Sequence, residues 1–154
     1  MIERTIIMKN NLIYFLSPHH NRSVVAQSWA EKLHLNHFKF YSSGWSNGYR
    51  DSFIVQAMRE LNIDISQMPS NQMDEELLEA SDFIIAIYDF HKEKRPPIKA
   101  NLKKKLIEWH VPSPCGENLF FLEDWSLYQE VCDHIAIEVK KLENVLSQKM
   151  NYSS

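Results

Sequence analysis

The sequence has few of the features that mark several classes of protein. It contains only two cysteines, Cys115 and Cys132, so neither a zinc site nor a disulfide framework is expected. Its net charge of -3 argues against general binding to nucleic acid, which usually needs an excess of basic residues. The longest hydrophobic runs, Leu12–Leu16 and Phe83–Ile87, are far too short to span a bilayer. We therefore expect no metal, no cofactor, no nucleic-acid partner and no membrane contact.

Length and composition favour one compact unit. A chain of 154 residues with 44% hydrophobic residues can bury one core but is too short for two. We predict an N-terminal extension over residues 1–10, a single domain over 11–148 and a C-terminal tail over 149–154. No secretory signal is recognisable, so a cytoplasmic location is expected.

Strand patterns alternate with helix patterns along the chain. Helices are predicted over Ser23–Leu35, after Asp51, over Asp74–Ala80, and along an apolar stripe from Tyr128 to Leu142. Strands are predicted over Leu12–Leu16, His37–Ser42, Phe83–Tyr88 and Leu106–Val111. This order predicts an α/β fold, a small doubly wound four-stranded parallel sheet flanked by helices.

In such a fold, ligands bind beyond the carboxyl ends of the strands, where the first strand turns into its helix. That turn lies within IYFLSPHHNRSVVAQ, residues 13–27. Amides at a helix start attract oxyanions, and an arginine can hold two oxygens at once. The candidate anion-binding residues are Ser17, His19, His20, Asn21, Arg22 and Ser23. The alternative is an ordinary capped turn with two histidines that only fill space.

Several collinear segments resemble one known family. IYFLSPHHNRSVVAQ, then AMRELNIDIS (57–66), DEELLEASDFIIAI (74–87) and EWHVPSP (108–114) are similar to the low-molecular-weight protein tyrosine phosphatases and the thioredoxin-coupled arsenate reductases. The resemblance covers roughly residues 11–146. It implies the same fold and a site for phosphate or arsenate, or for a phosphorylated protein.

The residues that carry the family's chemistry are not matched. Ser17 stands nearest to the nucleophilic cysteine, and a serine hydroxyl is not ionised at neutral pH. Four residues rather than five separate it from Arg22, and the loop lacks a glycine. Ser113 occupies the position of the general-acid aspartate, where it cannot donate a proton effectively. The redox cysteine pair implied for arsenate reduction is absent after the third strand.

Three interpretations follow. We expect a catalytically silent family member that binds a phosphate-like oxyanion or a phosphorylated partner through residues 17–23. The second is an active phosphatase or arsenate reductase whose catalytic residues are not yet identified. The third is a pure interaction module with a vestigial pocket. For such a module, the contact surface is an aromatic face or the segment His91–Lys105, whose seven Lys and Arg residues, with Glu93 as the one acid, could recruit an acidic partner. The alternative, which we favour for this segment, is loop charge that is only solvated.

Overall fold

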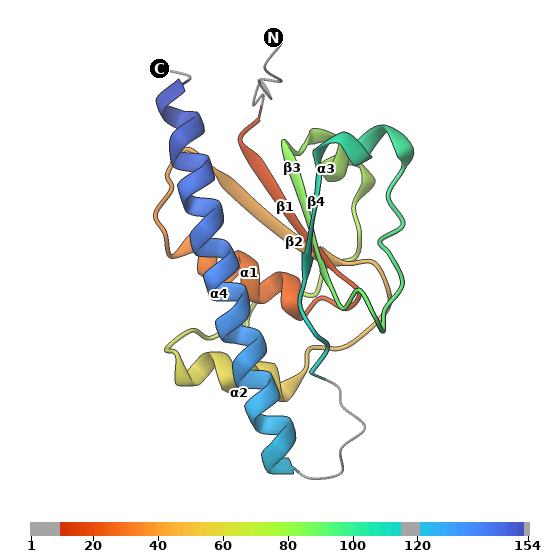
Figure 1. The fold of residues 1–154 in the computed structure, drawn as a ribbon, viewed down its shortest axis with the longest axis vertical. Coiled ribbons are helices and arrows are strands. Elements are labelled where there is room, and N and C mark those ends of the chain that lie inside the picture. The colour runs from red at the N-terminus through yellow and green to blue at the C-terminus, as the bar shows by residue number, and fades with distance from the viewer. Residues whose placement is uncertain (1–9, 115–120, 153–154) are drawn as a thin grey trace.

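The computed structural model describes residues 10–114 and 121–152. Its centre is a sheet of four parallel strands in the order β2-β1-β3-β4 (Figure 1). The strands are β1 (Leu12–Ser17), β2 (Lys39–Gly44), β3 (Phe83–Tyr88) and β4 (Leu106–His110). The predicted doubly wound parallel sheet is thereby confirmed.

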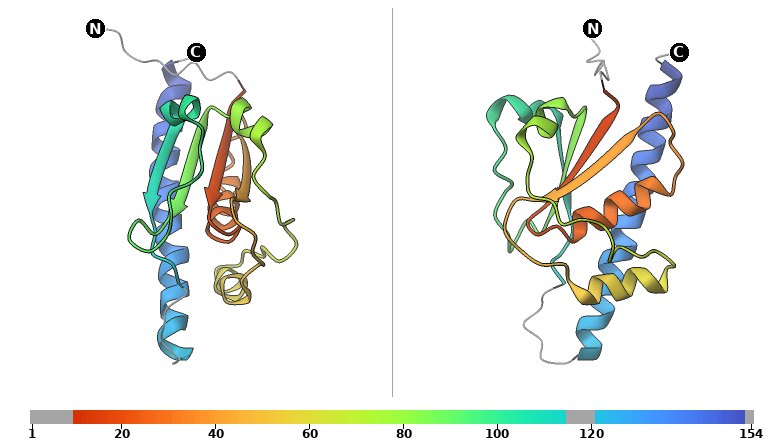
Figure 2. Two further views of the ribbon diagram at one scale, coloured as in Figure 1. Left: turned by 90° about the vertical axis from the view of Figure 1, so that its right-hand side faces the viewer. Right: turned by 180° about the vertical axis from the view of Figure 1, so that it is seen from behind.

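Helices cover both faces of this sheet (Figure 2). Helix α1 (Arg22–Glu31) and the long helix α4 (Phe121–Tyr152) lie on one face, and α2 (Ser52–Glu60) packs against α4. The short helix α3 (Glu75–Ala80) and a 3-10 helix, η1 (Ala100–Lys105), lie on the other face. No helix in the described ranges is long and apolar enough to cross a membrane.

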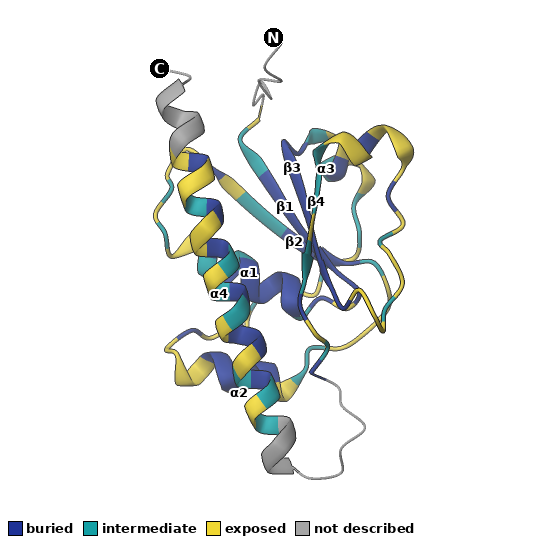
Figure 3. Ribbon diagram, viewed as in Figure 1, coloured by how far each residue is buried: buried dark blue, intermediate teal, exposed yellow. Residues whose placement is uncertain are grey.

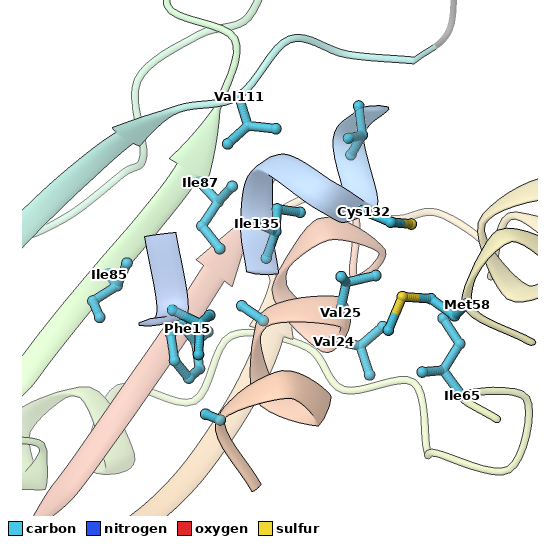
Figure 4. Close-up of a cluster of buried hydrophobic side chains, with 14 of the residues drawn as sticks. Phe15, Val24, Val25, Met58, Ile65, Ile85, Ile87, Val111, Cys132 and Ile135 are labelled. Carbon is cyan, nitrogen blue, oxygen red and sulfur yellow. The ribbon is translucent and has the colours of Figure 1, made fainter. Parts of the chain in front are cut away.

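The two faces of β1 feed two separate hydrophobic clusters, because successive side chains of a strand point to opposite sides. Ile13 and Phe15 join the larger cluster, which the helices α1, α2 and α4 complete (Figure 4). Tyr14 and Leu16 join the smaller cluster with residues from α3 and η1. All four side chains are fully buried, whereas α4 alternates buried and exposed residues along its length (Figure 3). The first strand is thus clamped from both sides, which fixes the position of the loop that follows it.

Some predicted boundaries differ from the structure. Helix α1 ends at Glu31 rather than Leu35, because the chain reverses through His34, whose φ is 53°. The predicted cap at Asp51 is confirmed: its carboxylate accepts the N–H of Phe53 at 2.9 Å. The 3-10 helix η1 was not predicted.

The cysteines differ in what can be said of them. Cys132 is fully buried on α4, and burial raises the pKa of its thiol to about 12. The predicted burial of Cys132 in the core is confirmed, and its low reactivity stays a prediction. Cys115 lies outside the described residues. Within those residues, no group of three or more His, Cys, Asp or Glu side chains is arranged to hold a metal ion.

Candidate functional site

The carboxyl end of β1 leads directly into the loop Pro18–Asn21, which joins it to α1 (Figure 1). The chain after β2 runs beside this loop. The N–H of Trp45 donates to the Ser17 carbonyl at 3.1 Å, and the N–H of Ser46 donates to the Pro18 carbonyl at 2.9 Å. The loop is therefore held by backbone contacts at the edge where a parallel sheet normally binds its ligand.

Ser17, which the sequence resemblance predicts to stand at the nucleophile position, lies in a network of neutral groups. Its buried hydroxyl shares one proton between the His19 carbonyl and Ser23 Oγ, the latter at 2.8 Å, and accepts the N–H of Ser23 at 3.0 Å. Ser23 Oγ in turn donates to the Ser43 carbonyl at 2.9 Å. None of these partners is a base at neutral pH, so none of them can take the proton of Ser17.

The backbone amides of the loop fall into two groups. The N–H of Asn21 donates to the His19 carbonyl at 2.7 Å, and the N–H of Ser23 is taken by Ser17. Within residues 10–114 and 121–152, by contrast, no acceptor is found for the N–H of His19 or of His20. Only part of the loop is therefore available to an anion.

His20 points its side chain into the protein. Its Nε2 lies 2.7 Å from Ser42 Oγ, and its Nδ1 accepts the N–H of Asn71 at 3.1 Å. Because Nδ1 accepts, the ring is neutral and the proton sits on Nε2. Burial, followed by the nearby charge of Arg50, lowers the pKa of His20 to about 4. This side chain, one of the candidate anion-binding groups, therefore contacts β2 and Asn71 in the interior.

His19 and Asn21 connect the loop to residues 48–51. The exposed ring of His19 packs against Gly48, where a Cβ would lie 2.5 Å from Nδ1. The Asn21 amide donates to the Tyr49 carbonyl at 3.2 Å and accepts the N–H of Asp51 at 2.8 Å. Asn21 is the N-cap residue of α1, yet its side chain caps no helix amide. It ties two loops together instead.

Arg22 is engaged by a carboxylate. Its Nη1 and Nη2 donate to the two oxygens of Glu93, each at 2.7 Å, and Nη1 also donates to the Val111 carbonyl at 3.0 Å. The side chain of Arg22 is only 5% exposed, and that of Glu93 is 18% exposed. The guanidinium expected to hold an oxyanion thus forms a bidentate ion pair within the protein.

Asp89 organises the turn that carries Glu93. Its carboxylate accepts the N–H groups of His91 at 2.9 Å, Lys92 at 3.2 Å and Ser113 at 3.3 Å. Burial raises the pKa of Asp89, but these donors outweigh burial and lower it overall. Ser113, at the general-acid position, is therefore joined through its backbone to a carboxylate that stays ionised.

The sequence interpretation missed both acids. Asp89 directly follows the buried strand β3, at the carboxyl edge where site residues gather, and this position is the signal that could have revealed it. Glu93 could be recognised only as the one acid in a basic segment. That pattern predicts neither the partner of the Glu93 carboxylate nor the direction in which its side chain points.

Aromatic side chains lie beside the turn of residues 89–93 and form a rim there. Phe90 is 45% exposed, with its ring centroid 4.8 Å from that of Tyr88 and 4.9 Å from that of His110. Trp45 packs edge-on against Tyr88 at 5.8 Å. Trp109, in contrast, lies 6.1 Å from Phe15 and packs against the core. A partly exposed aromatic rim therefore borders the segment that contacts Arg22.

Comparisons with known proteins agree with this architecture. The chain is 29% identical over 134 residues to an arsenate reductase of Oceanobacillus iheyensis, covering 86% of this chain and 95% of that protein. Among solved structures, a Cys-to-Ser mutant of the YwlE arginine phosphatase with a phosphorylated active-site serine superposes with a TM-score of 0.71 at 20% identity, covering 88% of this chain and 95% of the other. An arsenate reductase in the phosphate-binding state superposes with a TM-score of 0.68 at 19% identity, covering 85% and 95%.

The family model described as low molecular weight phosphotyrosine protein phosphatase matches residues 21–152. The match begins at Asn21, after the nucleophile position and the first three residues of the loop. It includes Arg22 and extends through α4. A match over most of the chain establishes that this protein belongs to the low molecular weight phosphotyrosine protein phosphatase family.

Proposed function

We propose that this protein is a catalytically silent member of its family that binds a phosphate-like oxyanion, either free or on a phosphorylated partner, through residues 17–23. The observation that carries the proposal is the environment of Ser17. Among the described residues, the partners of its hydroxyl are a carbonyl, a second hydroxyl and a backbone amide, and none of them activates it for attack.

Loss of a second catalytic part supports silence. The general-acid position holds Ser113, whose hydroxyl does not release a proton in the useful pH range. Asp89, whose carboxylate accepts the Ser113 N–H and two other backbone N–H groups, has a lowered pKa, so it is also a poor acid.

Retention of anion-binding groups supports the second half of the proposal. The amides of His19 and His20 have no acceptor in the described part of the chain, and Arg22 begins α1. A structural neighbour is described as an arsenate reductase in the phosphate-binding state, which makes phosphate and arsenate the first ligands to test.

The test of silence is turnover of an aryl phosphate, with a cysteine-bearing family member assayed in parallel. We expect no turnover above buffer. Because a neighbouring YwlE mutant carries phosphate on its active-site serine, the protein should also be examined by mass spectrometry after incubation with substrate. Turnover comparable to that of the active relative, or a phosphoryl group on Ser17, would contradict silence and favour an active enzyme.

The test of binding is thermal stabilisation by phosphate and arsenate. A ligand present at ten times its dissociation constant stabilises the folded state by about 1.4 kcal/mol. We expect this stabilisation in the wild type and its loss in Arg22→Ala. Arg59→Ala is the matched control, because Arg59 is exposed on α2 and pairs only with Asp64 and Ser66. If neither anion stabilises the wild type or any variant that frees Arg22, the pure interaction module is the better interpretation.

A further inference from the structure

We propose that Glu93 is a built-in competitor for the oxyanion, so that the anion site is closed in the unliganded protein and opens when Glu93 leaves Arg22. This inference rests on the proposed function, because it concerns access to the same site. It assigns Glu93, which lies between the family-like segments 74–87 and 108–114, a role in setting the affinity and selectivity of that site.

The geometry is that of a ligand already in place. Both carboxylate oxygens of Glu93 accept from the two terminal nitrogens of Arg22, each at 2.7 Å. A phosphate or arsenate would present two oxygens to the same planar fork. The Val111 carbonyl takes the other N–H of Nη1, so no donor remains on that nitrogen for an incoming anion.

Charge strengthens the competition. The side chain of Arg22 is 5% exposed, so its charge is screened little by water, and Glu93 neutralises it there. A dianion that approaches the loop while Glu93 is in place meets a paired arginine and a like charge beside it.

The segment that delivers Glu93 is a small turn, closed by two hydrogen bonds between Asp89 and Glu93. The N–H of Glu93 donates to the Asp89 carbonyl at 2.9 Å, and the N–H of Asp89 donates to Glu93 Oε1 at 2.7 Å. Residues 90–92 and 94–95 of this turn are exposed, so the turn can move without opening the core. Only Arg22 and the Asp89 amide bind the Glu93 carboxylate within the described residues.

The charged neighbours of Glu93 reduce the free-energy cost of releasing its carboxylate from Arg22. Lys92, Lys94 and Arg95 flank it in the chain, and all three are exposed. A carboxylate that leaves Arg22 therefore has three positively charged side chains close to it in the chain. In this exchange, the carboxylate of Glu93 loses its ion pair with Arg22 and becomes solvated near these cations. The guanidinium of Arg22 then binds the oxyanion.

The experiment is calorimetric titration of inorganic phosphate and of arsenate into the wild type, Glu93→Gln and Glu76→Gln. We expect Glu93→Gln to bind at least about ten-fold more tightly, since it removes the competing charge while keeping the side-chain shape. Glu76→Gln is the matched control, because Glu76 is an exposed residue on α3, and it should bind like the wild type. The gain should vanish when Arg22→Ala is added to Glu93→Gln.

A second readout needs no substitution at Glu93. In the wild type, phosphate should shift the amide resonances of Asp89 and Glu93, because the Asp89 N–H loses its acceptor when Glu93 moves. If the wild type binds phosphate in an Arg22-dependent way but these resonances stay in place and Glu93→Gln binds no more tightly, the competitor role is overturned while the proposed function stands. If neither the wild type nor Glu93→Gln binds phosphate or arsenate, the proposed function itself fails.

Discussion

The Cα of Gly44 packs directly against the backbone of His20: a Cβ at position 44 would lie 2.9 Å from His20 N. The carbonyl carbon of His19 and the carbonyl oxygen of Pro18 would lie at 3.2 and 3.3 Å. The loop after β1 therefore packs directly on Gly44, the last residue of β2. This residue has to be a glycine so that the loop can approach the sheet.

We predict that Gly44→Ala lowers the free energy of unfolding by about 1–3 kcal/mol, because the clash is with backbone that cannot rotate away. It should also weaken phosphate binding, since the loop must shift. Chemical denaturation and phosphate titration measure the two effects. Gly48→Ala is the matched control: the three atoms nearest to its new methyl group all belong to the exposed side chain of His19 and not to backbone, and that side chain can turn aside. An equal loss of stability in both variants would show that the close approach to the loop backbone is not the cause.

The neutral state of His20 predicts a stability that depends on pH. Its pKa is lowered from 6.5 to about 4, first by burial and then by Arg50, so the unfolded chain binds a proton more readily than the folded protein between these values. Stability from this group is complete above pH 6.5 and is lost as the pH falls toward 4. The loss amounts to at most about 3 kcal/mol.

Urea denaturation at several pH values between 7.5 and 4.5 measures this effect. His20→Gln should be less stable than the wild type at pH 7.5, because Gln cannot reproduce the contacts of the ring with Ser42 and Asn71. The decline of its stability with falling pH should be smaller. His37→Gln, which replaces an exposed histidine, should decline like the wild type. If His20→Gln declines as steeply as the wild type, another group causes the pH dependence.

Burial of Cys132 predicts an unreactive thiol. Its pKa of about 12 leaves almost no thiolate at pH 8, and its side chain is fully enclosed by the core. Peptide mapping after treatment with iodoacetamide should find Cys132 unmodified in the native protein. It should find Cys132 modified in about 6 M urea, which unfolds most small domains. Rapid native modification at Cys132 would mean that α4 opens locally.

The sheet could be predicted from the sequence because the hydrophobic composition of its strand segments indicates that they are buried. Phe83–Tyr88 is apolar at nearly every position, and it is buried along its whole length on both faces of β3. The end of α1 was harder to predict, because the turn through His34 depends on a positive φ that no glycine announces. The loop 18–21 was located correctly, because its position follows from topology alone.

The side-chain contacts within the site could not be predicted in the same way. The pairing of Arg22 with Glu93 joins residues 71 positions apart, and nothing local in either segment specifies it. The inward direction of His20 likewise depends on Ser42 and Asn71, which come from other elements. Residue types at a strand end indicate that a site exists, whereas tertiary contacts decide which of its groups a ligand can reach.

The double variant Ser17→Cys with Ser113→Asp tests whether the altered loop, and not only the missing groups, prevents catalysis. We predict aryl phosphate turnover no more than about ten-fold above buffer, which corresponds to an activation barrier lowered by no more than about 1.4 kcal/mol. A thiol at position 17 still has Ser23 beside it, but Arg22 stays paired with Glu93, and the loop is one residue shorter than in the family pattern. A carboxylate at position 113 would also lie near Asp89, which already binds the Ser113 N–H and would repel a second negative charge.

Each single variant serves as a control, and the pH dependence of iodoacetate modification reports whether the introduced thiol is ionised. Turnover approaching that of a cysteine-bearing relative would show that the shortened loop holds sulfur and phosphate in a reactive arrangement. Adding Glu93→Gln then separates the two causes: rescue only in the triple variant would attribute the silence to the occupied Arg22, and no rescue would attribute it to the loop.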